Sequence, residues 1–200
     1  MKTVIFATGN QNKLKEIREI MADIPDVRIV SMKEAGIEAD IVENGNTFEE
    51  NARIKAEAVS GISGEIVLAD DSGLVIDALN GEPGIFSARY MGEDTSYHIK
   101  NNELIRRLDG VTDEDRTARF VCAVAAAVPG KGTYVVRGVM EGRIGYEEKG
   151  ANGFGYDPIF FLPSYGKTSA EIPPEEKNRI SHRGKALRAV REVLVEEGIL

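Results

Sequence analysis

Two adjacent carboxylates, Asp70 and Asp71, constrain the fold of this chain more than any other feature of its sequence. They follow the apolar residues 66–69 and precede Ser72 and Gly73, which are residue types common in turns. A buried carboxylate without a partner is very costly, so the two side chains cannot both enter an apolar core. The pair therefore requires a cation, a solvent-filled cleft or a reaction. We expect a strand that ends at the pair and a Ser-Gly turn that presents both carboxylates.

Length and composition indicate one domain, residues 1–200, that needs no disulfide bonds. The chain is 42% hydrophobic, and its single cysteine, Cys122, lies inside an apolar run. No run approaches 18 apolar residues and no signal-peptide pattern is present, so we expect a cytoplasmic protein without a membrane segment. The net charge of −8 argues against a broad nucleic-acid surface, which requires a basic face.

Apolar periodicity predicts an α/β fold with a mixed sheet flanked by helices. We expect strands over residues 2–8, 27–31, 66–69, 119–128, 133–144 and 159–162, and one more ending near Glu43. We expect helices over residues 13–21, 48–59 and 96–108, and a last helix after Ser181. Thr47 and Glu50 have the spacing of a capping box. Because βα units alternate with a hairpin near residues 129–132, a mixed sheet is favoured over a parallel one.

The turn between the first strand and the first helix is a candidate phosphate site. Backbone N–H groups at a helix N-terminus, a hydroxyl and an ammonium all suit a phosphate group. The second glycine and the Lys-Ser/Thr pair of a P-loop are absent. Taken alone, the segment is more typical of an ordinary capped turn with a solvated lysine. Its residues are Thr8, Gly9, Asn10, Gln11, Asn12 and Lys13.

The acid pair and the upstream Glu43 are candidate ligands for Mg²⁺. This ion prefers oxygen ligands, often one or two carboxylates completed by substrate phosphates and water. A second carboxylate can orient or deprotonate a water molecule. The carboxyl end of a strand, where we expect the pair, is where ligands bind in open α/β sheets. The alternative is a turn acid followed by a capping acid, both solvated.

Two later segments carry further candidate binding groups. Glycines flank Phe154 within residues 153–157, so that the backbone can approach a flat ligand and the ring can stack on a base. The alternative places Phe154 in the core. His182 and Arg183 open the last helix, where cations oppose the helix dipole, which points to a role besides helix stability. The alternative for these two is a pair of solvated side chains.

Together and in this order, the segments resemble the Ham1-like inosine/xanthosine triphosphate pyrophosphatases. The likeness covers essentially the whole chain. It implies an elongated α/β fold in which a long mixed sheet separates two lobes, a central active-site cleft, and a homodimer. The matching segments are residues 8–13, 48–56, 69–74, 81–90 and 153–158, Lys177, and residues 181–183.

The resemblance also implies an activity: Mg²⁺-dependent hydrolysis of ITP, dITP and XTP to the monophosphate and pyrophosphate. Residues 8–13 and Lys55 would hold the triphosphate. Glu43, Asp70 and Asp71 would hold Mg²⁺, with Asp70 directed to the metal and Asp71 accepting the proton of the attacking water. The remaining predicted substrate-binding residues are Ser72, Phe154, Gly155, Tyr156, Asp157, Lys177, His182 and Arg183.

Two other functions compete with this one. A nucleotide sensor without catalysis would need the phosphate and base sites but not the three acids. A nucleic-acid-binding module would use the lysines and Phe154, and the charge of −8 disfavours it.

Overall fold

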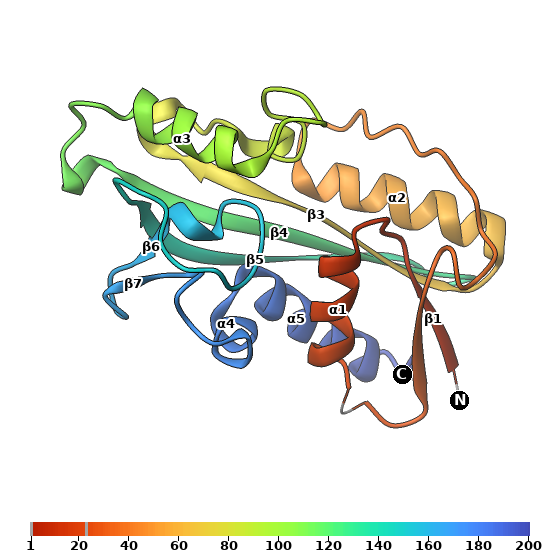
Figure 1. The fold of residues 1–200 in the computed structure, drawn as a ribbon. Helices are drawn as coiled ribbons and strands as arrows, with labels where there is room; N and C mark the ends of the chain where they lie inside the picture. Colours follow the sequence, from red (N-terminus) through yellow and green to blue (C-terminus); the bar gives the residue numbers. More distant parts are fainter. Residues whose placement is uncertain (1, 23) are drawn as a thin grey trace. The chain divides into compact units, whose positions relative to one another are not determined.

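A mixed seven-stranded sheet forms the centre of the fold in the computed structural model, which describes residues 2–22 and 24–200 (Figure 1). The strand order is β2-β1-β3-β4-β5-β6-β7. β1 pairs in parallel with β2 and β3, whereas β6 pairs antiparallel with β5 and β7, so the predicted mixed sheet is confirmed. The strands are β1 (Lys2–Phe6), β2 (Val27–Ser31), β3 (Ile66–Ile76), β4 (Thr117–Val128), β5 (Gly132–Ile144), β6 (Phe160–Leu162) and β7 (Lys167–Thr168).

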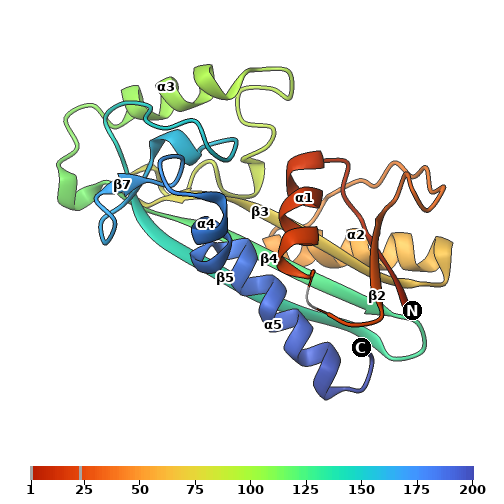
Figure 2. The same ribbon diagram turned by 60° about the horizontal axis from the view of Figure 1, so that its bottom comes forward.

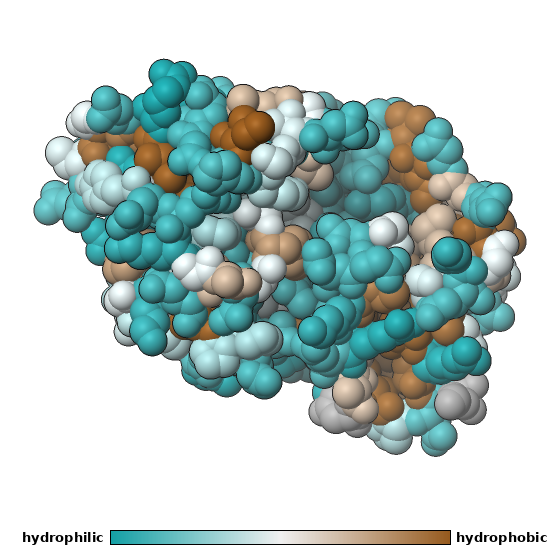
Figure 3. Space-filling view, in the orientation of Figure 1, coloured by the Kyte–Doolittle hydropathy of each residue, from teal (hydrophilic) through white to brown (hydrophobic). Residues whose placement is uncertain are grey.

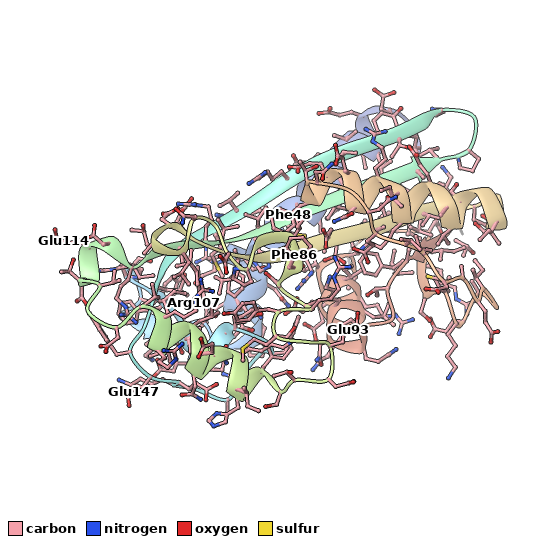
Figure 4. The ribbon with its side chains drawn as sticks, turned by 90° about the horizontal axis from the view of Figure 1, so that it is seen from above. Phe48, Phe86, Glu93, Arg107, Glu114 and Glu147 are labelled. Carbon is pink, nitrogen blue, oxygen red and sulfur yellow. The ribbon has the colours of Figure 1, made fainter. Side chains whose placement is uncertain are left out.

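Helix starts follow the capping residues in the sequence. The Thr47 side chain accepts from the Glu50 N–H and opens α2 as predicted, and the buried Phe48 is its first residue (Figure 4). The helix runs four residues beyond its predicted end, to the left-handed Gly64. The helices are α1 (Gln11–Ile20), α2 (Phe48–Ser63), α3 (Tyr97–Arg107), α4 (Pro174–Ile180) and α5 (His182–Glu196). The short α4 and β7 were not predicted.

The chain forms two compact units, each with its own apolar cluster. The first unit comprises Met1–Asp71, Cys122–Gly138 and His182–Leu200, and the second comprises Ser72–Val121 and Val139–Ser181. β3, β4 and β5 supply residues to both units.

In the first unit, α1 and α5 cover one face of the sheet and α2 covers the other (Figures 1 and 2). Phe6, Leu68 and Cys122 belong to the cluster that includes α1 and α5. The intervening strand residues, such as Val67 and Ala123, are also buried but lie outside that cluster. This alternation is expected of strands that are covered on both faces. It directs Leu68 to the layer formed by α1 and α5, and Val67 to the opposite face of β3.

The second unit packs α3 on its own strand segments. Leu104 and Leu108 join Leu74, Ile76 and Phe120 in its cluster. Arg107, the last residue of α3 (Figure 4), donates to the Glu82 carboxylate at 2.7 Å.

Two sequence predictions of secondary structure are wrong. β3 does not stop before the acid pair and turn at Ser72 and Gly73, but continues to Ile76. It can continue because both carboxylates have protein partners, and because Leu74 and Ile76 bury apolar surface beyond them. No strand ends near Glu43, since this acid lies in the irregular segment between β2 and α2.

Hydrophilic residues predominate on the face of the molecule seen in Figure 3, with separate hydrophobic patches. Within residues 2–22 and 24–200, no helix has both the length and the apolar character required to cross a membrane.

Candidate active site

Asp70 and Asp71 lie on opposite faces of β3. Consecutive side chains of a strand point to opposite sides of the sheet, so the uninterrupted strand separates the two carboxylates. Asp70 shares a face with Leu68 and receives its partners from α1 and α5. Asp71 points to the other face, where it contacts Asn51 of α2. The pair therefore does not act as two equivalent acids on one turn.

Asp70 is buried between two cations. The Lys13 Nζ lies 3.2 Å from its Oδ1 and 3.0 Å from its Oδ2, and the Arg183 Nε lies 3.3 Å from Oδ2. The carboxylate is only 1% exposed. Burial by itself would raise the pKa of Asp70, but Lys13 and Arg183 outweigh it and hold the pKa well below its usual range. Asp70 is therefore ionised at neutral pH inside the first unit.

Arg183 extends this group of charges to a second carboxylate. Its guanidinium also donates to Glu16, on α1. Arg183, one of the predicted substrate-binding residues, is 2% exposed and bonded to both carboxylates. His182, the other member of the predicted pair, is also buried in the first unit.

Asp71 has a different environment. The Asn51 Nδ2 donates to its Oδ2 at 3.1 Å, and the Asn51 Oδ1 accepts from the Gly45 N–H at 2.9 Å. Burial raises the pKa of Asp71, and it outweighs the opposing effects of Lys55, Asn51 and Lys13. Glu43 raises this pKa further by charge repulsion. A carboxylate with a raised pKa is a stronger base than an ordinary aspartate.

Glu43 and Lys55 complete the polar groups near Asp71. Their side chains form an ion pair at 3.2 Å. Glu43 also acts on Asp71 by charge repulsion. Among the described residues, no group of three or more acidic, histidine or cysteine side chains could hold a metal ion. Two carboxylates completed by substrate phosphates and water are nevertheless a donor set that suits Mg²⁺.

The predicted phosphate turn lies at the N-terminus of α1. The Asn10 side chain caps the helix by accepting from the N–H groups of Asn12 and Lys13, and the Thr8 Oγ1 accepts from the Asn10 N–H at 3.1 Å. Gly9, Gln11 and Asn12 are exposed. The half-buried Lys13 connects this turn to the acid pair through its ion pair with Asp70. The structure thus brings residues 8–13 together with Asp70.

The second unit contains the predicted base-binding segment. The Asp157 carboxylate is buried; its Oδ2 accepts from the Lys177 Nζ at 2.6 Å and from the Phe154 N–H at 2.9 Å. The Lys177 Nζ lies 5.1 Å from the centre of the Phe154 ring, and this ring is half-buried. Asp157 and Lys177 therefore hold the backbone and ring of Phe154.

Gly153 makes this arrangement possible. Its φ of +73° is in the left-handed region, and a Cβ there would lie 2.1 Å from the Asp157 Oδ2. Only glycine fits both constraints.

Tyr156 and Asp157, two of the predicted substrate-binding residues, are both buried. The Tyr156 hydroxyl donates to the Ser87 carbonyl at 2.6 Å, and its ring meets the Tyr97 ring edge-on with centroids 5.1 Å apart. Burial raises the pKa of Tyr156. Ser72 and Gly155, which were predicted with them, are half-buried.

The sequence prediction did not assign a role to Asn51 or Glu16. The spacing predicts Asn51 and Lys55 on the side of α2 opposite its apolar residues, but Asn51 is 1% exposed and belongs to the buried residues of the helix, as Ala52 and Ala56 do. A polar residue on the buried stripe of a helix is a signal that could have identified it. Glu16 gave no comparable signal.

Comparison with known proteins agrees with this arrangement of elements. A sequence model of the Ham1 family matches residues 4–193. The chain belongs to the Ham1 family. Among its relatives, a dITP/XTP pyrophosphatase of Geobacillus kaustophilus is 50% identical over 192 residues, which cover 96% of this chain and 94% of the relative. A dITP/XTP pyrophosphatase of Bacillus subtilis is 46% identical over 194 residues, which cover 97% and 98% of the two chains.

Solved structures of the family share the fold. A HAM1 protein from Coxiella burnetii superimposes with a TM-score of 0.88 at 42% identity, covering 98% of this chain and all of the other. A nucleoside-triphosphatase / dITP/XTP pyrophosphatase from Mycobacterium abscessus gives a TM-score of 0.74 at 39% identity, covering 94% and 98%. The predictions of the family, of the α/β fold and of an enzyme are confirmed.

Proposed function

We propose that this enzyme hydrolyses non-canonical purine nucleoside triphosphates, namely ITP, dITP and XTP, to the monophosphate and pyrophosphate. It would thereby remove these compounds from the nucleotide pool. The names of its Ham1 relatives support the reaction class and the substrate class.

One observation carries the proposal for the chemistry: Asp71 has a raised pKa and is held by the Asn51 amide. Such a carboxylate can accept the proton of an attacking water, which is the task of a general base. Asn51 holds one oxygen of Asp71, and the second oxygen would take the water. Lys55 and Lys13 both act on Asp71 electrostatically, so cations are near the reacting groups.

Phosphoryl transfer depends mainly on alignment and charge neutralisation. We assign both tasks for the triphosphate to Lys13, Lys55 and the N–H groups of the turn at residues 8–13. Glu43 and Asp71 would hold Mg²⁺, which supplies further neutralisation of phosphate charge when bound. We propose Phe154 as the stacking surface for the base, since its half-buried ring is held by Asp157 and Lys177.

Selection against adenine follows from the substituent of the base at position 6, whereas guanine shares the 6-oxo group and its exclusion must rest on its 2-amino group. Hypoxanthine and xanthine present an oxygen acceptor at position 6, whereas adenine presents an amino donor. A site with a donor at this place rejects adenine strongly, because two donors would face each other unpaired. His182 is a better candidate for this donor than Arg183, since the Arg183 guanidinium already bonds two carboxylates.

Product analysis tests the proposal. The enzyme is incubated with ITP, XTP, dITP, ATP or GTP at equal concentration, with and without Mg²⁺, and pyrophosphate and orthophosphate are measured separately. We expect pyrophosphate from the first three with Mg²⁺ and little product from ATP or GTP. Release of orthophosphate alone would contradict the reaction. Stoichiometric binding of ITP without turnover would instead support a nucleotide sensor. The homodimer and the cytoplasmic location stay predictions from the family resemblance.

A further inference from the structure

We propose that Asp70 is a positioning residue for Lys13: its carboxylate holds the lysine ammonium for the triphosphate, and Arg183 and Glu16 hold Asp70 in turn. This inference rests on the proposed function and assigns a role to a carboxylate that the sequence predicted as a metal ligand. It also gives Arg183 a task within the first unit.

The contacts of Asp70 support this role. Both of its oxygens lie within 3.2 Å of the Lys13 Nζ, and one also lies 3.3 Å from the Arg183 Nε. Its side chain is 1% exposed, whereas that of Lys13 is 17% exposed. The anion is thus buried behind a lysine that reaches solvent, so that the lysine is the member of the pair able to meet a phosphate.

The remaining members of the group restrict the movement of Asp70. Arg183 extends from α5 and Glu16 from α1, and these two helices pack against each other. The charges therefore alternate in sign along this series of contacts. It runs from Glu16 of α1 to Arg183 of α5, then to Asp70 of β3 and to Lys13 near the start of α1. Two anions and two cations cancel formally, which lets the group be buried without a net charge. A long lysine fixed in this way loses less freedom when it binds a phosphate.

The two cations that contact Asp70 disfavour a role of this carboxylate as a metal ligand. Two cations already occupy its lone pairs, and a divalent cation at the same oxygens would meet their repulsion. Asp71, on the opposite face, accepts from the Asn51 amide instead. We therefore assign the metal to Asp71 and Glu43 rather than to Asp70.

The direction in which anion affinity changes distinguishes a positioning role of Asp70 from a purely electrostatic effect. Replacing Asp70 with Asn removes a negative charge beside Lys13, which by electrostatics alone would strengthen anion binding. If Asp70 positions Lys13, the same change weakens anion binding, because the ammonium loses its fixed place. We therefore expect the dissociation constant for inorganic tripolyphosphate to rise about tenfold or more.

The experiment measures tripolyphosphate binding by calorimetry with chelator present, in the wild-type chain, Asp70→Asn, Lys13→Met and the double variant. We expect Asp70→Asn to weaken binding in the wild-type background and to have little further effect in the Lys13→Met background. Glu19→Gln is the matched control. It removes an exposed carboxylate of α1, the helix that carries Lys13, and this carboxylate is ion-paired with Lys15 rather than Lys13. Stronger binding by Asp70→Asn, or an equal effect in both backgrounds, would overturn the proposal.

Activity gives an independent readout. The Mg²⁺ concentration for half-maximal ITP hydrolysis is expected to stay unchanged in Asp70→Asn, while KM rises. A large rise in that Mg²⁺ concentration would identify Asp70 as a metal ligand and overturn the proposal. If Asp70→Asn does not fold, Glu16→Gln replaces it: weaker tripolyphosphate binding supports the proposal and unchanged binding contradicts it. A wild-type chain that binds tripolyphosphate but does not cleave ITP refutes only the proposed function.

Discussion

Asp70 and Asp71 are consecutive residues of β3 whose carboxylates lie on opposite faces of the sheet. One is fixed by cations from α1 and α5, and the other is held by an amide from α2. The same strand therefore holds, at adjacent positions, one carboxylate with a lowered pKa and one with a raised pKa. This division of roles leads to separate expectations for each residue.

Replacing Asp71 with Asn removes the proposed base and keeps the size of the side chain. We expect kcat for ITP hydrolysis to fall by about 100- to 10,000-fold, as is usual when a general base is lost. Binding of ITP, measured by calorimetry with a chelator present, should change little, because the direct contacts to the triphosphate are assigned to other residues. A variant that retains wild-type turnover would exclude Asp71 as the base.

Asn51→Ala releases Asp71 and also removes the acceptor of the Gly45 N–H. We expect kcat to fall roughly tenfold, which corresponds to losing one hydrogen bond to a charged group, with a smaller change in KM. Arg53→Gln is the control, since Arg53 is an exposed residue of the same helix that pairs with Glu57. Equal effects of the two substitutions in steady-state kinetics would show that Asn51 acts only through the stability of α2.

The lowered pKa of Asp70 predicts how stability depends on pH. Its folded pKa lies below that of the unfolded chain, so the folded state binds fewer protons at this site. Its contribution is therefore complete above the unfolded pKa of about 3.9 and is lost as the pH falls towards the folded value. Urea unfolding in metal-free buffer should show a free energy of unfolding that declines through this acid range.

The same measurement on Asp70→Asn provides the comparison. We expect a loss of about 3–5 kcal/mol at neutral pH, because Lys13 and Arg183 lose a buried counter-charge. The decline of stability with acid should also be shallower, since one of the titrating groups is gone. An unchanged acid dependence would mean that Asp70 is not the group responsible.

Phe154→Ala tests the proposed stacking on the base. Loss of a stacked aromatic ring costs about 1–3 kcal/mol, so we expect KM for ITP to rise by about tenfold while binding of tripolyphosphate, which has no base, is unchanged. Phe154→Tyr keeps an aromatic face and should retain most of the affinity. A parallel loss of ITP and tripolyphosphate binding in Phe154→Ala would argue for a general structural role.

Gly153→Ala and Gly155→Ala form a matched pair. Both positions have positive φ, at +73° and +67°, but a Cβ at 153 would lie 2.1 Å from the Asp157 Oδ2 while one at 155 would make ordinary contact with Tyr97. We expect Gly153→Ala to destabilise the chain by about 1–3 kcal/mol more than Gly155→Ala, as is typical of overpacking. Thermal unfolding measures the difference, and equal melting temperatures would contradict the close contact.

Much of the fold was predictable because its signals are local. Thr47 and Glu50 predicted the start of α2, and glycines near residues 129–132 predicted the turn between β4 and β5. The short α4 and β7 escaped prediction, since seven and two residues give too little periodicity to recognise.

The buried partners of the site were not predictable in the same way. The sequence predicted Tyr156 and Arg183 as substrate-binding residues. In the structure, the Tyr156 hydroxyl donates to the Ser87 carbonyl. The Arg183 guanidinium donates to Asp70 and Glu16. These contacts join residues that are 69, 113 and 167 positions apart in the chain. No spacing rule connects positions so distant from each other.

The sequence by itself determined the family, the longer strands and helices in their order, and the presence of two adjacent carboxylates after an apolar run. Only the tertiary structure decided where those carboxylates lie and which groups they contact. An acid pair next to Ser-Gly favours a turn as long as no partner is known, because burying it alone is costly. Lys13, Arg183 and Asn51 remove that cost, so the strand continues through Asp70 and Asp71 and its alternation directs them to different faces.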